Sequence, residues 1–204
     1  MSKNDIFNDV SRETFERLET YVDLLVRWNS KINLVSKTTI PQVWERHLTD
    51  SAQLFSLSST FTSWVDMGSG GGFPGLVIAI YAAEFCSEGH VTLIESDQRK
   101  CAFLRTVGRE TGVDVTVISE RIESVPPQNA DVISARALTS LDGLLEFSVR
   151  HMDPNGTALF LKGARWNLEL EEAKRLWRFR YEAHQSKTDP EAVILEVGGI
   201  ERVQ

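Results

Sequence analysis

The stretch Asp66-Met-Gly-Ser-Gly-Gly-Gly-Phe-Pro-Gly75 begins at the end of a short run of β-forming residues, Trp64–Met67, and precedes an apolar segment of helical length. Its glycines allow the backbone to approach a ligand closely, because side chains at these positions would stand in the way. A strand, a glycine-rich turn and a helix in this order place backbone N–H groups and a helix N-terminus at the carboxyl end of a sheet. The stretch therefore predicts a nucleotide-type cofactor site in an α/β fold.

Short β-rich runs alternate with helical stretches around this turn. We expect strands at Trp64–Met67, Val91–Glu95, Val115–Ile118, Asp131–Ser134 and Ala158–Lys162. Helices fit between them at Pro74–Phe85, Arg99–Thr111 and Leu141–His151. Successive βα units predict an open, mostly parallel sheet with helices on both faces, as in Rossmann-like folds.

The last forty residues have a different pattern. A charged helix is expected at about Leu168–Leu176, followed by two strand-like runs, Phe179–Gln185 and Val193–Val197. The turn Thr188-Asp189-Pro190 joins the two runs. This ending predicts an antiparallel hairpin at the edge of the sheet.

The first 60 residues are predicted to be helical. Apolar residues recur at helical spacing within residues 11–29, with Ser11 as a possible N-cap, at Phe15, Leu18, Val22 and Leu25. A second helix is expected from Pro41 to Leu54, and its inner face carries Trp44, Leu48 and Ser51. Because no linker follows, we expect an N-terminal helical extension (1–60) packed on a Rossmann-like domain (61–204) as one compact unit.

Composition limits the partners and the compartment. The chain has 204 residues and a net charge of −7, and its acid excess lies in residues 64–161, with 7 basic and 13 acidic groups. A field of this sign repels nucleic acid, so any RNA contact must come from local basic clusters. No long apolar run and no signal or transit pattern is present in the sequence, so we expect a cytoplasmic protein without a membrane partner.

The two cysteines give no sign of a disulfide or a metal site. Cys86 and Cys101 have neither CxxC spacing nor a neighbouring histidine cluster. We expect two reduced thiols on helices and no bound metal.

The glycine turn alone leaves the cofactor open, because Gly70-x-Gly72-x-x-Gly75 also satisfies the dinucleotide pattern of NAD- or flavin-dependent oxidoreductases. Asp66, directly before the turn, can orient the loop around a cofactor. Glu95, at the end of the next strand, can accept hydrogen bonds from both ribose hydroxyls. The antiparallel ending favours methyl transfer with S-adenosylmethionine. Each acid also has a structural interpretation, as a loop brace or as an ordinary strand-end carboxylate.

Five motifs together resemble the bacterial RsmG (GidB) family from about residue 15 to the C-terminus. They are Trp28-Asn29-x-x-Ile32-Asn33-Leu34, Arg46-His47-x-x-Asp50-Ser51, the glycine turn, Glu95-Ser-x-x-Arg-Lys100 and Ser134-Ala-Arg-Ala137. The resemblance implies an α/β class I (Rossmann-like) methyltransferase sheet with an N-terminal helical extension, and S-adenosylmethionine as cofactor. It implies methylation of guanine N7 at position 527 of 16S rRNA, with the 30S subunit or an assembly intermediate as partner. We expect a monomer.

The resemblance also assigns site residues. It places Gly68, Phe73, Ile122, Glu123 and Arg136 at the cofactor, beside Asp66, Gly70 and Glu95. Guanine N7 carries no proton, so its methylation needs positioning and electrostatics more than a general base. We therefore assign the catalytic role to Arg136, which can pair with guanine O6 or a phosphate. The alternative is a structural ion pair between Arg136 and either Asp66 or Glu123.

Other chemistries fit the residues less well. Cytosine C5 methylation needs a cysteine nucleophile, and both cysteines are predicted away from the catalytic edge. Exocyclic amine methylation commonly uses an Asn/Asp-Pro-Pro-aromatic segment, whereas Ser134-Ala-Arg-Ala-Leu138 stands at that place. A non-catalytic RNA-binding module remains a third hypothesis.

The candidate RNA contacts lie in three basic segments. They are Lys31, Asn33, Lys37 and Arg46 in the extension, Arg99, Lys100 and Arg105 after Glu95, and Lys162 and Arg165 after the fifth strand. We expect Trp28 and Trp44 to pack in the core. His47 and Asp50 are predicted to form a structural pair that holds the extension against the glycine turn.

Overall fold

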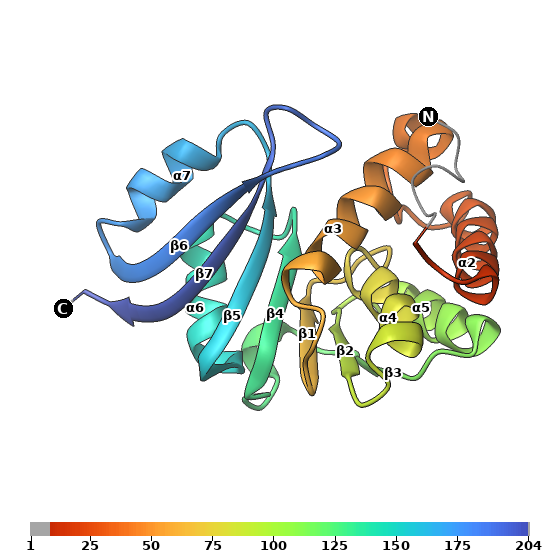
Figure 1. Ribbon diagram of the computed structural model, residues 1–204, viewed down its shortest axis with the longest axis horizontal. Coiled ribbons are helices and arrows are strands. Elements are labelled where there is room, and N and C mark those ends of the chain that lie inside the picture. The colour runs from red at the N-terminus through yellow and green to blue at the C-terminus, as the bar shows by residue number, and fades with distance from the viewer. Residues whose placement is uncertain (1–8, 204) are drawn as a thin grey trace.

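The computed structural model describes residues 9–203, and the part of the extension before residue 9 lies outside this range. A seven-stranded sheet has the order β3-β2-β1-β4-β5-β7-β6 (Figure 1). Its strands are β1 Ser63–Met67, β2 His90–Ile94, β3 Val115–Ile118, β4 Ala130–Arg136, β5 Met152–Lys162, β6 Trp177–Gln185 and β7 Val193–Arg202. Strands β1 to β5 pair in parallel, and β7 is antiparallel to both β5 and β6. The predicted fold class is confirmed.

Helices cover both faces of the sheet. Helices α2 (Arg12–Asn29), α3 (Asp50–Leu57), α4 (Gly75–Phe85) and α5 (Gln98–Thr111) share one apolar core with sheet residues such as Trp64 and Leu93. Helices α6 (Leu141–His151) and α7 (Trp166–Ala173) pack on the other face, over Val65 and Met67. Because strand side chains alternate between faces, Asp66 points to the same side as Trp64, toward α4.

The first predicted helix is confirmed as α2. The Ser11 Oγ accepts a hydrogen bond from the Thr14 N–H at 3.2 Å, as an N-cap residue does. The buried side chains Leu18, Tyr21 and Leu25 join the core that also contains α4 and α5. The described part of the extension is therefore packed on the sheet domain, while the boundary at residue 60 remains a prediction.

The second predicted helix is not one regular α-helix. The chain forms a 3-10 helix, η1 (Lys37–Gln42), a π-helical turn, η2 (Trp44–Thr49), and then α3. Pro41 lies inside η1 rather than at the first position of an α-helix. The inner face is correct, since Trp44, Leu48 and Ser51 are buried. Wide π turns occur often at functional sites, and this one contains Arg46 and His47.

Smaller differences concern ends of elements. Helix α7 begins and ends earlier than predicted, whereas β5, β6 and β7 are longer. Cys101 lies in α5, but Cys86 directly follows α4 instead of lying on a helix, and both cysteines are free. Among the described helices, none is both long and apolar enough to cross a membrane.

Candidate active site

The glycine turn between β1 and α4 adopts backbone conformations that favour glycine. The φ angles of Gly68, Gly70 and Gly72 are 67°, 55° and 93°. A Cβ on Gly70 would meet only the Gly68 carbonyl oxygen, at 3.8 Å, so space is open there. At Gly75 a Cβ would lie 2.4 Å from Leu93 Cδ2, so the missing side chain lets α4 pack closely on the sheet. The turn thus provides a backbone cradle for a ligand.

A cavity of about 550 Å³, here called the glycine-turn cavity, lies beside this turn at the carboxyl ends of the strands. Its volume lies within the usual range of small-molecule sites. All the predicted cofactor residues except Asp66 line it, namely Gly68, Gly70, Phe73, Glu95, Ile122, Glu123 and Arg136. The structure therefore brings together residues from four separate segments.

Glu95 fixes the cradle and keeps capacity for a ligand. One carboxylate oxygen accepts a hydrogen bond from the Gly70 N–H at 2.9 Å, and the other accepts from the Asp97 N–H at 2.8 Å. A carboxylate offers about four lone-pair positions, so these two bonds leave acceptor sites for two ribose hydroxyls. The donor set thus fits the ribose of an adenosyl cofactor.

Asp66 lies behind the turn, fully buried, and does not line the cavity. Its Oδ1 accepts from the Ser134 hydroxyl at 2.7 Å, and its Oδ2 accepts from the Gly75 N–H at 3.3 Å. The Ser134 oxygen in turn accepts from Trp64 Nε1–H at 2.9 Å. Burial raises the pKa of Asp66 to about 6. This geometry favours the loop-brace interpretation of Asp66 over a direct cofactor contact.

Tyr21 of α2 also braces the turn. Its hydroxyl donates to the Gly71 carbonyl oxygen at 2.5 Å, and its ring lies 5.1 Å from that of Phe73. No local pattern in the sequence indicated this contact, because the two segments are 50 residues apart.

The predicted adenine segment, Ile122 and Glu123, lies in a 3-10 turn, η3 (Ile122–Ser124). The end of α6 holds both sides of this turn. The Arg150 guanidinium donates twice to the Val125 carbonyl, at 3.1 and 2.9 Å. His151 Nε2 lies 3.0 Å from the Ile122 carbonyl oxygen and must carry the proton, because a carbonyl can only accept. Sequence reasoning missed this two-residue clamp, which appears only once α6 packs beneath η3.

Arg136, the last residue of β4, stands between two cavities. It lines the glycine-turn cavity and also a neighbouring cavity of about 630 Å³, here called the hairpin cavity because the β6–β7 loop forms one wall. Many charged side chains contribute to this second lining, including Arg46, Asp50, Lys162, Arg165, Glu169 and Glu172.

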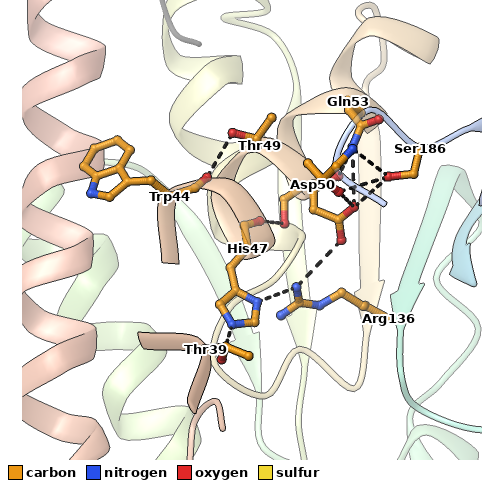
Figure 2. Close-up of polar contacts among 10 residues, drawn as sticks. Thr39, Trp44, His47, Thr49, Asp50, Gln53, Arg136 and Ser186 are labelled. Carbon is orange, nitrogen blue, oxygen red and sulfur yellow. Dashed lines mark hydrogen bonds and ion pairs between the residues drawn. The ribbon is translucent and has the colours of Figure 1, made fainter. Parts of the chain in front are cut away.

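Three groups hold the Arg136 guanidinium, and Figure 2 shows two of them, His47 and Asp50. Its Nη1–H donates to His47 Nδ1 at 2.8 Å, and the same nitrogen lies 4.0 Å from Asp50 Oδ2. Its central carbon lies 4.8 Å from the centre of the Phe73 ring. The ionic partner is thus Asp50, not Asp66 or Glu123 as the alternative expectation had it. His47 and Asp50 act together on Arg136 rather than as a pair of their own.

The hydrogen bonds fix the tautomer of His47. Because an arginine can only donate, Nδ1 of His47 accepts and Nε2 carries the proton. Nε2–H then donates to the Thr39 hydroxyl at 2.8 Å, which donates to the Ser36 carbonyl at 2.9 Å. Burial, with Arg136 and Arg46, lowers the pKa of His47 to about 4, so the ring is neutral at neutral pH.

His47 and Asp50 join the extension to the rest of the site. The His47 ring stacks on Phe73 with centres 5.1 Å apart, which holds η2 against the glycine turn. Asp50 Oδ1 accepts from the Thr188 hydroxyl at 3.0 Å, and Gln53 Oε1 accepts from the Lys187 N–H at 2.7 Å. The extension therefore contacts both the cofactor turn and the hairpin loop.

The candidate RNA residues separate into different places. Arg46 and Arg165 line the hairpin cavity, whereas Lys31, Asn33, Lys37, Arg99 and Lys100 line a third cavity. Lys162 is only 8% exposed and pairs with Glu169 at 2.6 Å, so it forms part of the wall of the hairpin cavity instead of extending into solvent. Arg105 lines none of these cavities and donates to the Val117 carbonyl. Trp44 is buried and Trp28 packs against the core, as predicted.

Two of the solved structures similar to this chain are SAM-dependent methyltransferases. A SAM dependent methyltransferase from Aquifex aeolicus matches with a TM-score of 0.58 at 15% identity, covering 77% of this chain and 92% of that one. A TehB-like SAM-dependent methyltransferase from Corynebacterium glutamicum matches with a TM-score of 0.60 at 13% identity, covering 89% and 98%. At such low identity these matches establish the fold alone.

The sequence comparisons reach further. The family described as "GidB: rRNA small subunit methyltransferase G" matches residues 14–193. A relative from Ruegeria sp. (strain TM1040), named "Ribosomal RNA small subunit methyltransferase G", is 54% identical over 195 residues, covering 96% of this chain and 95% of the relative. An NAD- or flavin-dependent oxidoreductase is not favoured. The chain belongs to the rRNA small subunit methyltransferase G (GidB) family.

Proposed function

We propose that this enzyme transfers a methyl group from S-adenosylmethionine to N7 of the guanosine at position 527 of 16S rRNA. Family membership makes it an S-adenosylmethionine-dependent rRNA methyltransferase. The observation that carries the finer assignment is the position of Arg136, whose guanidinium lies at the boundary between the two cavities. A donor-only group at this point suits an acceptor atom that needs orientation and no deprotonation.

His47, beside Arg136, is a poor general base, and the Asp50 carboxylate is already engaged in hydrogen bonds, which supports the same proposal. His47 has its Nδ1 lone pair engaged by Arg136 and a pKa lowered to about 4. Asp50 accepts from Thr188 and Ser186 and faces the guanidinium. Guanine N7 is already a lone-pair nucleophile, whereas methylation of an amine or of cytosine C5 would require further chemistry at this place.

Different residues of the chain would bind the cofactor and orient the acceptor base. S-adenosylmethionine supplies an electrophilic methyl group when it is bound. Glu95 would hold the ribose, the backbone at Gly68 and Gly70 would approach the cofactor, and η3 would border the adenine. Arg136 would then donate to guanine O6 or to a phosphate in the hairpin cavity and leave N7 free. His47 and Asp50 act as positioning residues, because they hold the guanidinium in place.

The decisive experiment is methyl transfer from labelled S-adenosylmethionine to 30S particles that lack the modification. Digestion to nucleosides should yield 7-methylguanosine, and sequencing of the product should locate it at position 527. Label in protein, or in another base, would overturn the proposal. Parallel reactions with naked 16S rRNA would decide whether a ribonucleoprotein is required.

Two further assignments belong to the same proposal. We expect a cytoplasmic monomer. Light scattering after gel filtration would test the monomeric state, and fractionation of cells would test the location. Calorimetry should detect binding of S-adenosylhomocysteine and none of NAD. Binding of neither ligand would instead favour a non-catalytic RNA-binding module.

A further inference from the structure

A third cavity, of about 270 Å³, is lined by four cations and a single carboxylate. Its charged lining residues are Lys31, Lys37, Arg99, Lys100 and Asp97. We call this cavity the lysine cleft. Two segments far apart in sequence build it, residues 29–37, from the end of α2 to the start of η1, and residues 97–100 at the start of α5. The whole chain carries a net charge of −7, so this cluster of positive side chains is opposite in sign to the overall charge of the protein.

The only carboxylate in the cleft is already engaged. Asp97 Oδ1 accepts from the Arg99 and Lys100 N–H groups at 2.8 and 3.3 Å, and its Oδ2 pairs with Arg99 at 3.0 Å. Within residues 9–203, no carboxylate lies within 4.0 Å of the ammonium groups of Lys31, Lys37 or Lys100. These three positive charges in the cleft therefore have no carboxylate counter-ion in the described part of the chain.

The loop that carries Lys31 is held by internal hydrogen bonds. Asn29, which is buried, accepts through its Oδ1 from the Leu34 N–H at 2.8 Å and from the Val35 N–H at 3.0 Å. These bonds close the chain between residues 29 and 35 and leave Lys31 exposed on the surface. The backbone that carries Lys31 is therefore ordered before an anion binds, so little backbone conformational entropy is lost on binding.

The lysine cleft adjoins the reaction site. Lys100 lines both the cleft and the glycine-turn cavity, and Leu34 also lines that cavity. The hairpin cavity shares Arg136 with the glycine-turn cavity but shares no lining residue with the lysine cleft. An extended polyanion could therefore occupy the cleft while one of its bases enters the hairpin cavity.

We propose that the lysine cleft binds the phosphodiester backbone of the RNA whose guanosine enters the hairpin cavity. This inference rests on the proposed function. Lysine ammonium groups bind phosphate as point charges, without reading sequence, and they fix the register of the nucleic acid on the protein. Recognition then requires an RNA segment long enough to span from the cleft to the hairpin cavity, and a free nucleoside gains nothing from the cleft.

The test replaces Lys31 and Lys37 together by alanine (K31A/K37A). The matched control is R175A/R178A, which also removes two positive charges, from exposed positions that line none of the three cavities. Binding to unmodified 30S particles is measured between about 50 and 200 mM KCl. Affinity falls as salt rises, and each contact to single-stranded phosphate contributes about 0.7 to the steepness of log affinity against log salt. The cleft variant loses two such contacts, so its slope should be less steep by about 1.4.

The control variant should keep the wild-type slope, and K31R/K37R should restore it. In K31A/K37A, KM for the particles should rise while kcat and S-adenosylhomocysteine affinity stay unchanged, which excludes misfolding. If wild-type enzyme methylates the particles but K31A/K37A matches R175A/R178A in slope and KM, the lysine-cleft proposal is wrong and the proposed function stands. If the wild-type enzyme methylates no RNA, the proposed function itself fails.

Discussion

The glycine-turn cavity and the hairpin cavity share Arg136 but are built in different ways. The first is shaped by backbone, which buried side chains hold in place. Glu95 accepts a hydrogen bond from the Gly70 N–H, and Asp66 accepts one from the Gly75 N–H. The second is lined by charged side chains that pair with one another, such as Lys162 with Glu169 and Arg136 with Asp50.

This difference indicates that cofactor binding and RNA-base binding depend on different kinds of groups. A cofactor that every turnover uses can be recognised by a rigid backbone shape, whereas an RNA base is recognised by side-chain charge and hydrogen bonding. Changes behind the glycine turn should therefore alter cofactor affinity or stability. Changes in the hairpin cavity should alter turnover and leave cofactor affinity nearly intact.

The largest effect is expected where the cavities meet. Replacing Arg136 by alanine removes the group that orients the acceptor, and losing one such preorganised donor typically costs about 10²–10³ in kcat. Single-turnover methyl transfer measures this loss, and S-adenosylhomocysteine binding should change little. Arg175→Ala serves as a control for loss of one exposed cation. A fully active Arg136→Ala enzyme would remove Arg136 from the mechanism.

The buried groups on the two sides should give opposite pH dependence of stability. Asp66 has a folded pKa of about 6, above its ordinary 3.8, so its contribution to the free energy of unfolding falls by about 3 kcal/mol as the pH rises from about 4 to 6. His47 has a folded pKa of about 4, below its ordinary 6.5. Its contribution to the free energy of unfolding is therefore lost as the pH falls from 6.5 to about 4.

The two contributions therefore offset each other in the wild type. Asp66→Asn should make stability rise more steeply with pH between about 4 and 6, and His47→Gln should make it rise less steeply. Urea unfolding at several pH values measures both slopes. Identical slopes in all three proteins would show that neither group titrates as described.

A cofactor-side effect of intermediate size is expected at Glu95. In Glu95→Gln the amide NH₂ must face one of two backbone N–H donors, those of Gly70 and Asp97, so one charge-assisted hydrogen bond is replaced by repulsion. Glu95→Gln also replaces the charged acceptor for the ribose hydroxyls by a neutral one. A hydrogen bond to a charged group contributes about 1.5 kcal/mol, so affinity for S-adenosylhomocysteine should fall about tenfold. Glu110→Gln, on the exposed end of α5, is the control. An effect on kcat without an effect on affinity would contradict this assignment.

The smallest effect concerns the clamp beneath η3. Arg150→Ala removes two hydrogen bonds to the Val125 carbonyl, so that η3 is no longer held in place before the cofactor binds. If binding must then supply this ordering, at about 1 kcal/mol, S-adenosylhomocysteine affinity should fall roughly fivefold. Arg150→Lys should recover part of the affinity, because it can still donate to that carbonyl. Unchanged calorimetric affinity in Arg150→Ala would show that η3 keeps its position without the clamp.

Much of the fold could be predicted because its signals are local. Short β-rich runs marked the strands, helical spacing marked α2, and the stretches between the strands marked α4, α5 and α6 close to their observed bounds. The helix expected from Pro41 was the main error, since proline and the packing of Trp44 select 3-10 and π turns that hydrophobic spacing does not distinguish.

The site was predicted unevenly for the same reason. Glu95 and the glycines lie next to strands whose ends meet at one edge, so their convergence followed from the topology. The bonds of Tyr21 to Gly71, Arg150 to Val125 and Thr188 to Asp50 join segments that only the folded chain brings together.

The sequence by itself determined the order of strands and helices, the glycine cradle and the family, because each depends on residues close together in the chain. Only the tertiary structure decided that Asp66 braces the turn while Glu95 faces the cavity, since the two carboxylates differ in burial and not in local pattern. It also decided that His47 and Asp50 hold Arg136, and that Lys31 and Lys37 meet Lys100 in one cleft. Side-chain partners depend on how elements pack in space, and that packing is a property of the whole chain.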